Sequence, residues 1–187
     1  RRKSKNDILR EQMTGKILWG GVRKAVKKDI IAKYNVRYSD LRVGEEAIYS
    51  FKVLYHAKTF SFIDVPVYNY VVHEGSLSQT LIDDPWGPIS ISMKDCITQM
   101  GVYKEYADTI NAFIITAGAI SLYKMAKIYS YNEYLQHAKI RVKRLKTEID
   151  TSFNIDYKHM DIKAKLITPL LKIYFLMPIY YISKLRK

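Results

Sequence analysis

The residues best suited to chemistry form a short acidic corner, Gly44-Glu45-Glu46, which is followed by an apolar run ending at Leu54. Glycine adopts backbone conformations that a side chain would forbid, so Gly44 permits a sharp turn. Two carboxylates after such a turn fall in the first turn of a helix, where negative charge is favoured. A carboxylate presented from this corner could act as a general base. The simpler alternative is the acidic first turn of an ordinary amphipathic helix.

A helix is predicted after this corner, and strands are predicted around it. Four apolar residues recur on one face of the predicted helix: Ile48, Phe51, Leu54 and Tyr55. Residues 59–63 and 67–72 alternate and are rich in β-branched and aromatic residues, which predicts two strands. Residues 16–22 predict a further short strand or extended segment that ends in a glycine pair. We therefore expect the helix to pack on a sheet.

The second half of the chain predicts helices only. Apolar residues recur with helical spacing in three stretches: 86–100, 106–125 and 132–149. A turn cluster at 83–88 suggests a boundary between a first part, residues 1–82, and a helical subdomain, residues 83–187. The predicted fold class is therefore α/β, with a partial mixed sheet over about residues 16–80 and a mainly helical C-terminal subdomain.

Composition limits the kinds of partner and site. The 187 residues carry a formal net charge of +13, which favours anionic partners such as nucleotide sugars, nucleic acid or acidic lipid, unless it reflects a solvated lysine face. No nucleic-acid-binding signature occurs, so nucleic acid is not an expected partner, although a basic binding module remains an alternative. Cys96 is the single cysteine, and its helical spacing from Met93 and Ile97 indicates a core position.

Short motifs follow one another in a recognisable order between residues 16 and 80. They are Ile17-Leu18-Trp19, Arg23-Lys24, Tyr34-Asn35-Val36-Arg37-Tyr38, Gly44-Glu45-Glu46, Ala57-Lys58, Ile63-Asp64-Val65-Pro66, Tyr68-Asn69-Tyr70 and the loop from His73 to Ser78. Together they resemble the acceptor-side portion of family 2 glycosyltransferases of the GT-A fold, the type that builds bacterial cell-surface polysaccharides. The resemblance covers about a third of the chain. No single motif in the series is specific to this family, but the order of the motifs along the chain is.

The resemblance implies an inverting hexosyltransferase. The second acidic residue of the corner, Glu46, would deprotonate an acceptor hydroxyl, which attacks the anomeric carbon of a nucleotide-diphosphate sugar. The family usually has aspartate here, and glutamate is one methylene longer. Glu45 matches the first acidic residue and would orient the loop or the acceptor. Trp19 matches an aromatic residue near the acceptor sugar, with packing in the core as the alternative.

Donor binding is expected to lie largely elsewhere. His73, Ser76 and Ser78 match positions near the donor phosphates or their metal, with His73 as the one candidate ligand. The complete enzyme is expected to use Mn²⁺ or Mg²⁺, but no Asp-x-Asp motif occurs, and Asp83-Asp84 has the wrong spacing. The nucleotide-binding half would then be missing, so that the isolated chain is expected to be inactive and to self-associate through uncovered apolar surface. A degenerate scaffold remains the alternative.

The C-terminal segment, residues 161–187, suggests contact with a membrane. It is apolar and rich in tyrosine, is interrupted by Pro169 and Pro178, and has basic residues at both ends. Such a pattern favours a helix that lies in the interface of an anionic membrane. We therefore expect a cytoplasmic protein that is peripheral on the inner face of the membrane. The alternative is a terminal helix that packs back on the protein.

Overall fold

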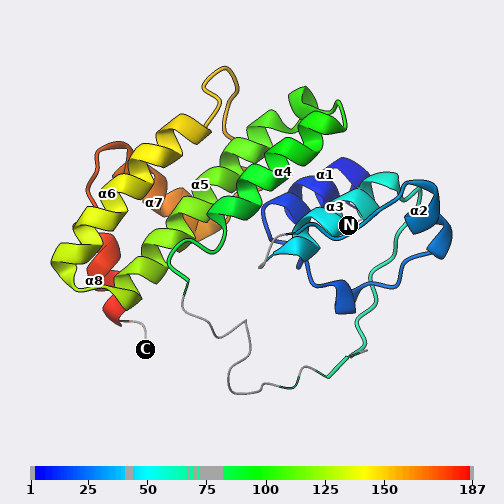
Figure 1. The fold of residues 1–187 in the computed structure, drawn as a ribbon, viewed down its shortest axis with the longest axis horizontal. Helices are drawn as coiled ribbons and strands as arrows, with labels where there is room; N and C mark the ends of the chain where they lie inside the picture. The colour runs from blue at the N-terminus through cyan, green and yellow to red at the C-terminus, as the bar shows by residue number, and fades with distance from the viewer. Residues whose placement is uncertain (1–2, 41–43, 67, 70, 72–81, 186–187) are drawn as a thin grey trace.

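Every regular element in the described part of the chain is a helix (Figure 1). The computed structural model describes residues 3–40, 44–66, 68–69, 71 and 82–185. Their elements are α1 (Lys5–Met13), the short 3₁₀ helix η1 (Gly21–Arg23), α2 (Lys28–Lys33), α3 (Glu45–His56), α4 (Gly87–Gln99), α5 (Tyr103–Ile128), α6 (Tyr131–Glu148), α7 (Ile162–Lys172) and α8 (Met177–Leu185).

The predicted α/β fold is wrong, because no strand occurs in the residues that the structure describes. Part of the expected first strand is the turn η1, and residues 57–66 run as coil. An alternating segment becomes a strand only when a neighbouring strand satisfies its backbone N–H and C=O groups. The described residues offer no such neighbour, so Phe62 and Ile63 remain 68% and 71% exposed.

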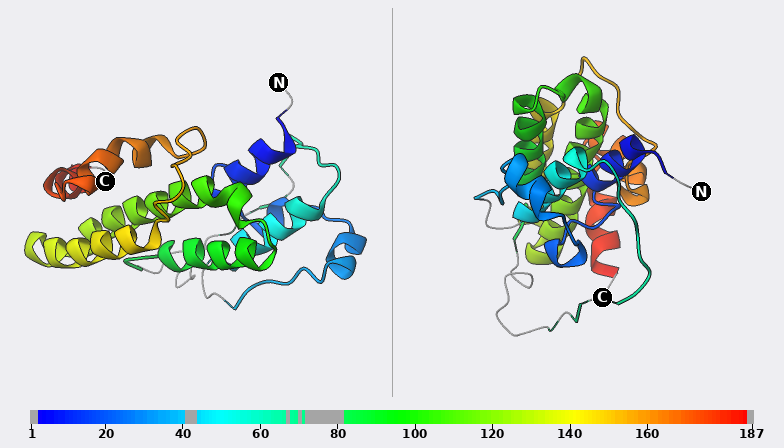
Figure 2. Two further views of the ribbon diagram at one scale, coloured as in Figure 1. Left: turned by 90° about the horizontal axis from the view of Figure 1, so that it is seen from above. Right: turned by 90° about the vertical axis from the view of Figure 1, so that its right-hand side faces the viewer.

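The helix α5 organises the fold. It contacts α1, α4, α6, α7 and α8. The helices α4, α5 and α6 lie side by side, and α7 and α8 form a second layer over them (Figures 1 and 2). By length and composition α5 is apolar enough to cross a membrane, but 83% of its apolar window is buried inside the protein. Its hydrophobicity is therefore accounted for by the core that it forms.

The helices α1 and α3 share this core. Leu9 and Met13 of α1 and Phe51 of α3 belong to the same hydrophobic cluster as Met93 of α4 and Phe113 of α5. All five side chains are at most 2% exposed. Elements from both sides of the boundary expected near residue 83 thus bury their apolar faces against one another. The cluster also contains Cys96, which confirms its predicted core position.

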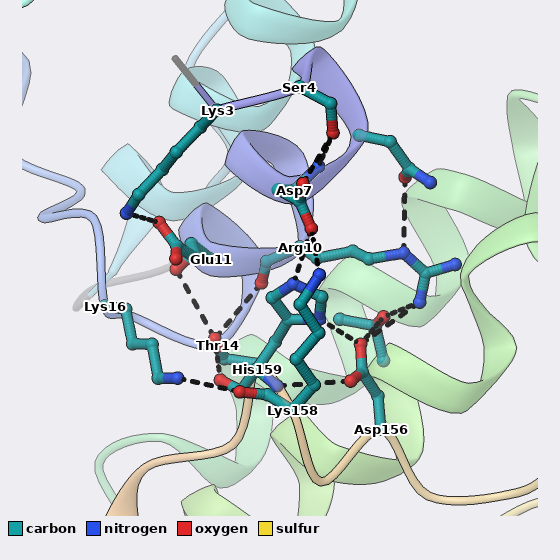
Figure 3. A network of polar contacts seen from close by, with 12 residues as sticks. Lys3, Ser4, Asp7, Arg10, Glu11, Thr14, Lys16, Asp156, Lys158 and His159 are labelled. Carbon is teal, nitrogen blue, oxygen red and sulfur yellow. Dashed lines mark hydrogen bonds and ion pairs between the residues drawn. The ribbon is translucent and has the colours of Figure 1, made fainter. Parts of the chain in front are cut away.

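A partly buried network of charged side chains joins α1 to α5 and to the loop before α7 (Figure 3). Arg10 Nη1 lies 2.7 Å from Asp108 Oδ1 and 3.1 Å from Asp156 Oδ2. His159 Nδ1 lies 2.7 Å from Asp156 Oδ2, and its Nε2 atom lies 3.1 Å from Asp7 Oδ1. The network therefore fixes the N-terminal helix to a segment that is distant in the sequence.

This network is expected to weaken in acid. Burial would raise the pKa of Asp156, but hydrogen bonds involving His159 and Thr109 outweigh it and hold this pKa below its ordinary value. A hydrogen bond from Lys158, with smaller contributions from Ser4 and His159, holds the pKa of Asp7 far below its ordinary value. Because both folded-state pKa values lie below the unfolded-state ones, their stabilising contribution is present above about pH 4 and is lost as the pH falls further.

Urea unfolding at several pH values measures this effect. We expect the unfolding midpoint to fall between about pH 5 and about pH 3, where these carboxylates become protonated in the unfolded chain. The variant Asp156→Asn should be less stable at neutral pH and should lose less stability on acidification, because it has one carboxylate fewer to protonate. Parallel declines in the two proteins would contradict a role for Asp156.

Candidate functional site

The acidic corner lies at the start of α3, as predicted. Gly44 precedes the helix with a left-handed φ of 82°, and Glu45 and Glu46 form its first turn. A Cβ atom on Gly44 would overlap the side chain of Ile89 in α4. Glycine is therefore required here by backbone conformation and by close packing.

Substituting Gly44 by alanine is expected to destabilise the protein by about 2 kcal/mol or more. The left-handed conformation alone costs a non-glycine residue about 1–2 kcal/mol, and the added methyl group must also displace Ile89. Gly101→Ala is the matched control, since Gly101 has a similar φ of 74° and no atom near the added methyl group. Equal losses of unfolding free energy in the two alanine variants, measured with urea, would show that the corner moves away from Ile89 at no cost in stability.

Glu46 is tied to a distant turn. The backbone N–H of Gly21 donates a hydrogen bond of 2.8 Å to Glu46 Oε1, across 25 residues of sequence. The other carboxylate oxygen, Oε2, has no hydrogen-bond partner within the described residues. A Cβ atom on Gly21 would lie 2.6 Å from the hydroxyl oxygen of Tyr38, so a larger residue here would displace the end of that exposed side chain. One oxygen of Glu46 is thus anchored, and its side chain is held in one orientation.

A lysine stabilises the turn that holds Glu46. Lys24 Nζ donates hydrogen bonds to the carbonyl oxygens of Leu18 and Trp19, each 2.8 Å long, and to that of Gly20 at 3.2 Å. Burial lowers the pKa of Lys24, and the negative charge of Glu46 opposes this shift. The carboxylate of Glu46 therefore lies beside a cation whose hydrogen bonds stabilise the turn.

Two stacked tyrosines border the corner. The rings of Tyr38 and Tyr49 lie 4.3 Å apart with an angle of 7° between their planes. Burial raises the pKa of Tyr38, and Tyr49, Glu46 and Glu45 raise it further. Neither tyrosine was predicted as a site residue. The available signal was the spacing of Tyr49 from Glu46, since residues three apart share a helix face.

Trp19 lies behind the corner. Its ring centroid is 4.5 Å from that of Trp86 and 5.7 Å from that of Phe113, and its Nε1 atom donates a 2.6 Å hydrogen bond to the carbonyl of Gln12. The hydroxyl of Ser50 donates a 2.6 Å hydrogen bond to the carbonyl of Trp19. This geometry favours the core-packing alternative for the Trp19 ring, whereas the backbone of its segment contacts the corner.

The predicted donor-side residues cannot be placed, because His73, Ser76 and Ser78 lie outside the described residues. Within the described residues, no group of three or more His, Cys, Asp or Glu side chains is arranged to hold a metal ion. Asp84, whose pairing with Asp83 has the wrong spacing for the metal motif, lies 3.0 Å from Arg141 and accepts a 3.0 Å hydrogen bond from Gly87 at the start of α4.

Comparisons with protein-family models, with curated proteins and with solved structures find no significant match for this chain. The chemistry therefore has to be argued from the geometry of the corner. That geometry is a carboxylate with one anchored oxygen, beside a pair of stacked aromatic rings and a half-buried lysine. Such a carboxylate can accept a proton from a hydroxyl group that approaches it.

Proposed function

We propose that this chain supplies the general base of an inverting glycosyltransferase, which moves a sugar from a nucleotide-diphosphate donor to a hydroxyl group of a glycan or lipid-linked glycan. One observation supports this proposal above the others. The segment that follows one motif of the resemblance, Ile17-Leu18-Trp19, meets a second motif, Gly44-Glu45-Glu46, at the carboxylate of Glu46 through the 2.8 Å contact with Gly21. The donor would be bound by residues beyond this chain.

In the proposed reaction, Glu46 takes the proton of the acceptor hydroxyl. The resulting oxygen nucleophile attacks the anomeric carbon, the bond from that carbon to the diphosphate oxygen breaks, and the new linkage has the inverted configuration. Positioning matters because a small displacement of a catalytic group can cost about 10²-fold in rate. The contact with Gly21 restrains the glutamate side chain, which is one methylene longer than the usual aspartate.

Acceptor-dependent release of nucleoside diphosphate tests this proposal. The product of the complete gene is incubated with a panel of nucleotide sugars, with and without oligosaccharide acceptors. We expect at least one donor to release its diphosphate faster when an acceptor is present, and we expect the product to show inverted anomeric configuration by NMR. Retained configuration, or no acceptor-dependent release from any donor, would contradict the proposal and would favour a scaffold or a basic binding module.

A second function is supported by α7 and α8. We propose that these helices bind the anionic inner face of a membrane. One face of each helix packs on the protein, through Leu171 in α7 and Ile179 in α8. The other faces of the helices and the link between them carry exposed apolar side chains: Ile162, Leu166, Ile173, Phe175, Met177, Tyr181, Ile182 and Leu185. The two alternatives considered for this segment, packing back and membrane contact, are therefore compatible.

The positive charge of α7 and α8 supports membrane binding by the same surface. Lys163, Lys172 and Lys184 are exposed on or beside these apolar faces, and each basic residue near an anionic membrane contributes about 1 kcal/mol of attraction. In Figure 2 the two helices form an outer layer of the molecule, which leaves this surface accessible. The arrangement is that of an interfacial amphipathic segment, with apolar side chains toward the lipid and cations near the head groups.

Sedimentation with lipid vesicles tests the membrane proposal. Vesicles that contain phosphatidylglycerol should bind the wild-type protein. The double variant Leu166→Glu/Ile182→Glu should bind at least about tenfold more weakly, because two apolar side chains that would contact the lipid are replaced by charges. Ile140→Glu is the matched control, since Ile140 is equally apolar and 68% exposed but lies on α6. Equal binding by the double variant and the control would exclude α7 and α8 as the contact.

A further inference from the structure

A cavity of about 290 Å³ lies between α5, α7 and the turn that follows α1. Apolar side chains of Trp86, Ala119, Ile120 and Ile167 form much of its wall. Binding cavities for small molecules are typically apolar, with a few polar groups that fix the orientation of the ligand. This cavity is separate from the carboxylate of Glu46, which does not line it.

Three lysines also line the cavity: Lys16, Lys124 and Lys163. Lys16 and Lys163 are exposed, and Lys124 is half-buried. Within the described residues, none of the three forms an ion pair. Lys16 uses one donor on the carbonyl of Lys158, at 3.1 Å, and an ammonium group has three donors. The cavity thus combines an apolar wall with cations that can bind an anion.

Among the described residues that line the cavity, the one acidic side chain is already engaged. Asp161 caps the start of α7, where its Oδ1 atom accepts hydrogen bonds from the backbone N–H groups of Lys163 at 2.8 Å and Ala164 at 3.4 Å. Its charge neutralises at most one of the three lysines. The cavity therefore retains a net positive charge, which favours an anionic ligand.

We propose that this cavity binds a single-chain amphiphile with a phosphate head group. The alkyl chain would lie against Trp86, Ala119 and Ile167, and the phosphate would lie between the lysines. Removal of the alkyl chain from water favours binding, and ion pairs with the lysines select the anionic head group. This inference does not depend on the proposed transferase activity or on membrane binding by α8.

The two tryptophans of the chain provide a direct readout. Trp86 lines the cavity, and its ring is 4.5 Å from that of Trp19. A ligand that enters the cavity replaces solvent beside the Trp86 ring, so its binding should change the intrinsic tryptophan fluorescence.

Titration with dodecyl phosphate, below the concentration at which it forms micelles, tests the proposal. We expect a saturable change in fluorescence, with dodecanol and inorganic phosphate each binding at least about tenfold more weakly, which corresponds to about 1.4 kcal/mol. Equal binding of dodecanol would show that the lysines do not contribute, and an equal response to inorganic phosphate would show a site for the anion alone. Either result would overturn the assignment.

Two variants locate the site. Lys124→Glu/Lys163→Glu should weaken the binding of dodecyl phosphate by about tenfold or more while leaving that of dodecanol little changed, because only the head group meets the lysines. Lys139→Glu/Lys143→Glu is the control, with the same change of charge on exposed positions of α6. Ala119→Leu should block the chain by filling the cavity. Unchanged affinity in the Lys124 and Lys163 variant, whose substitutions are at the surface or half-buried, would overturn the proposal even if Ala119→Leu fails to fold.

Discussion

Replacing Glu46 by glutamine is expected to lower acceptor-dependent sugar transfer by about a hundredfold or more, because a positioned general base contributes about 10²–10⁴-fold. Glutamine has nearly the same shape and can still accept the hydrogen bond from Gly21 through its carbonyl oxygen. The variant therefore keeps the geometry of the corner and loses only the group that accepts the proton. The loss should appear in kcat, with thermal stability close to that of the wild-type protein.

Two further substitutions make this experiment specific. Glu45→Gln removes the same charge from the neighbouring position, and it should reduce the rate much less if Glu46 is the base. Glu46→Asp keeps a carboxylate but shortens the reach toward Gly21, so an intermediate rate is expected. Transfer by Glu46→Gln at the wild-type rate would disprove the assignment of Glu46, and Glu45 would then have to be tested as the base.

Replacing Arg141 by methionine is expected to cost about 3–5 kcal/mol of stability, which is typical when one partner of a buried ion pair is removed. Arg141 is 3% exposed, and it lies 3.0 Å from Asp84 Oδ2 and 3.0 Å from Glu148 Oε2. These two carboxylates are only 15% and 10% exposed. Without Arg141 they would share the remaining cation, Arg144, at the surface.

Urea unfolding of matched variants separates the two arginines. Arg144→Met should cost no more than about 1 kcal/mol, because Arg144 is 49% exposed and solvent screens its ion pairs. Asp84 accepts a hydrogen bond from Gly87 at the start of α4, so the loss of Arg141 should also loosen that turn. Similar losses of unfolding free energy in the two methionine variants would mean that water already reaches the carboxylates and screens the ion pairs of Arg141 as it does those of Arg144.

The helices could be predicted because their signal is local. The apolar positions that recur with helical spacing in α4, α5 and α6 are the positions that the structure buries, among them Met93 and Phe113. A single helix satisfies its own backbone hydrogen bonds, so its pattern does not depend on a partner. The strand prediction failed for the opposite reason. Residues 59–63 alternate correctly, but alternation specifies a strand only where another strand is present to pair with it.

The site was predicted in part. The corner at Gly44 is recognisable because a glycine followed by two carboxylates is a local signal, and the structure places it at the start of α3. The contact between Gly21 and Glu46, and the stack of Tyr38 on Tyr49, join residues from different segments. No spacing in the sequence specifies such pairs. The same holds for Asp84, whose partner Arg141 lies in α6, the third helix that follows it along the chain.

The coil that follows α3 exposes the chain to proteolytic cleavage. Residues 58–66 run outside the core, and all of them except the half-buried Phe60 are exposed. Exposed extended segments are preferred sites of proteolytic cleavage. The helices α1 and α3 on one side of this segment and α4 and α5 on the other share a single hydrophobic cluster. A cut within residues 58–66 should therefore leave two fragments that remain bound as a noncovalent complex, because the core and not the peptide link holds them together.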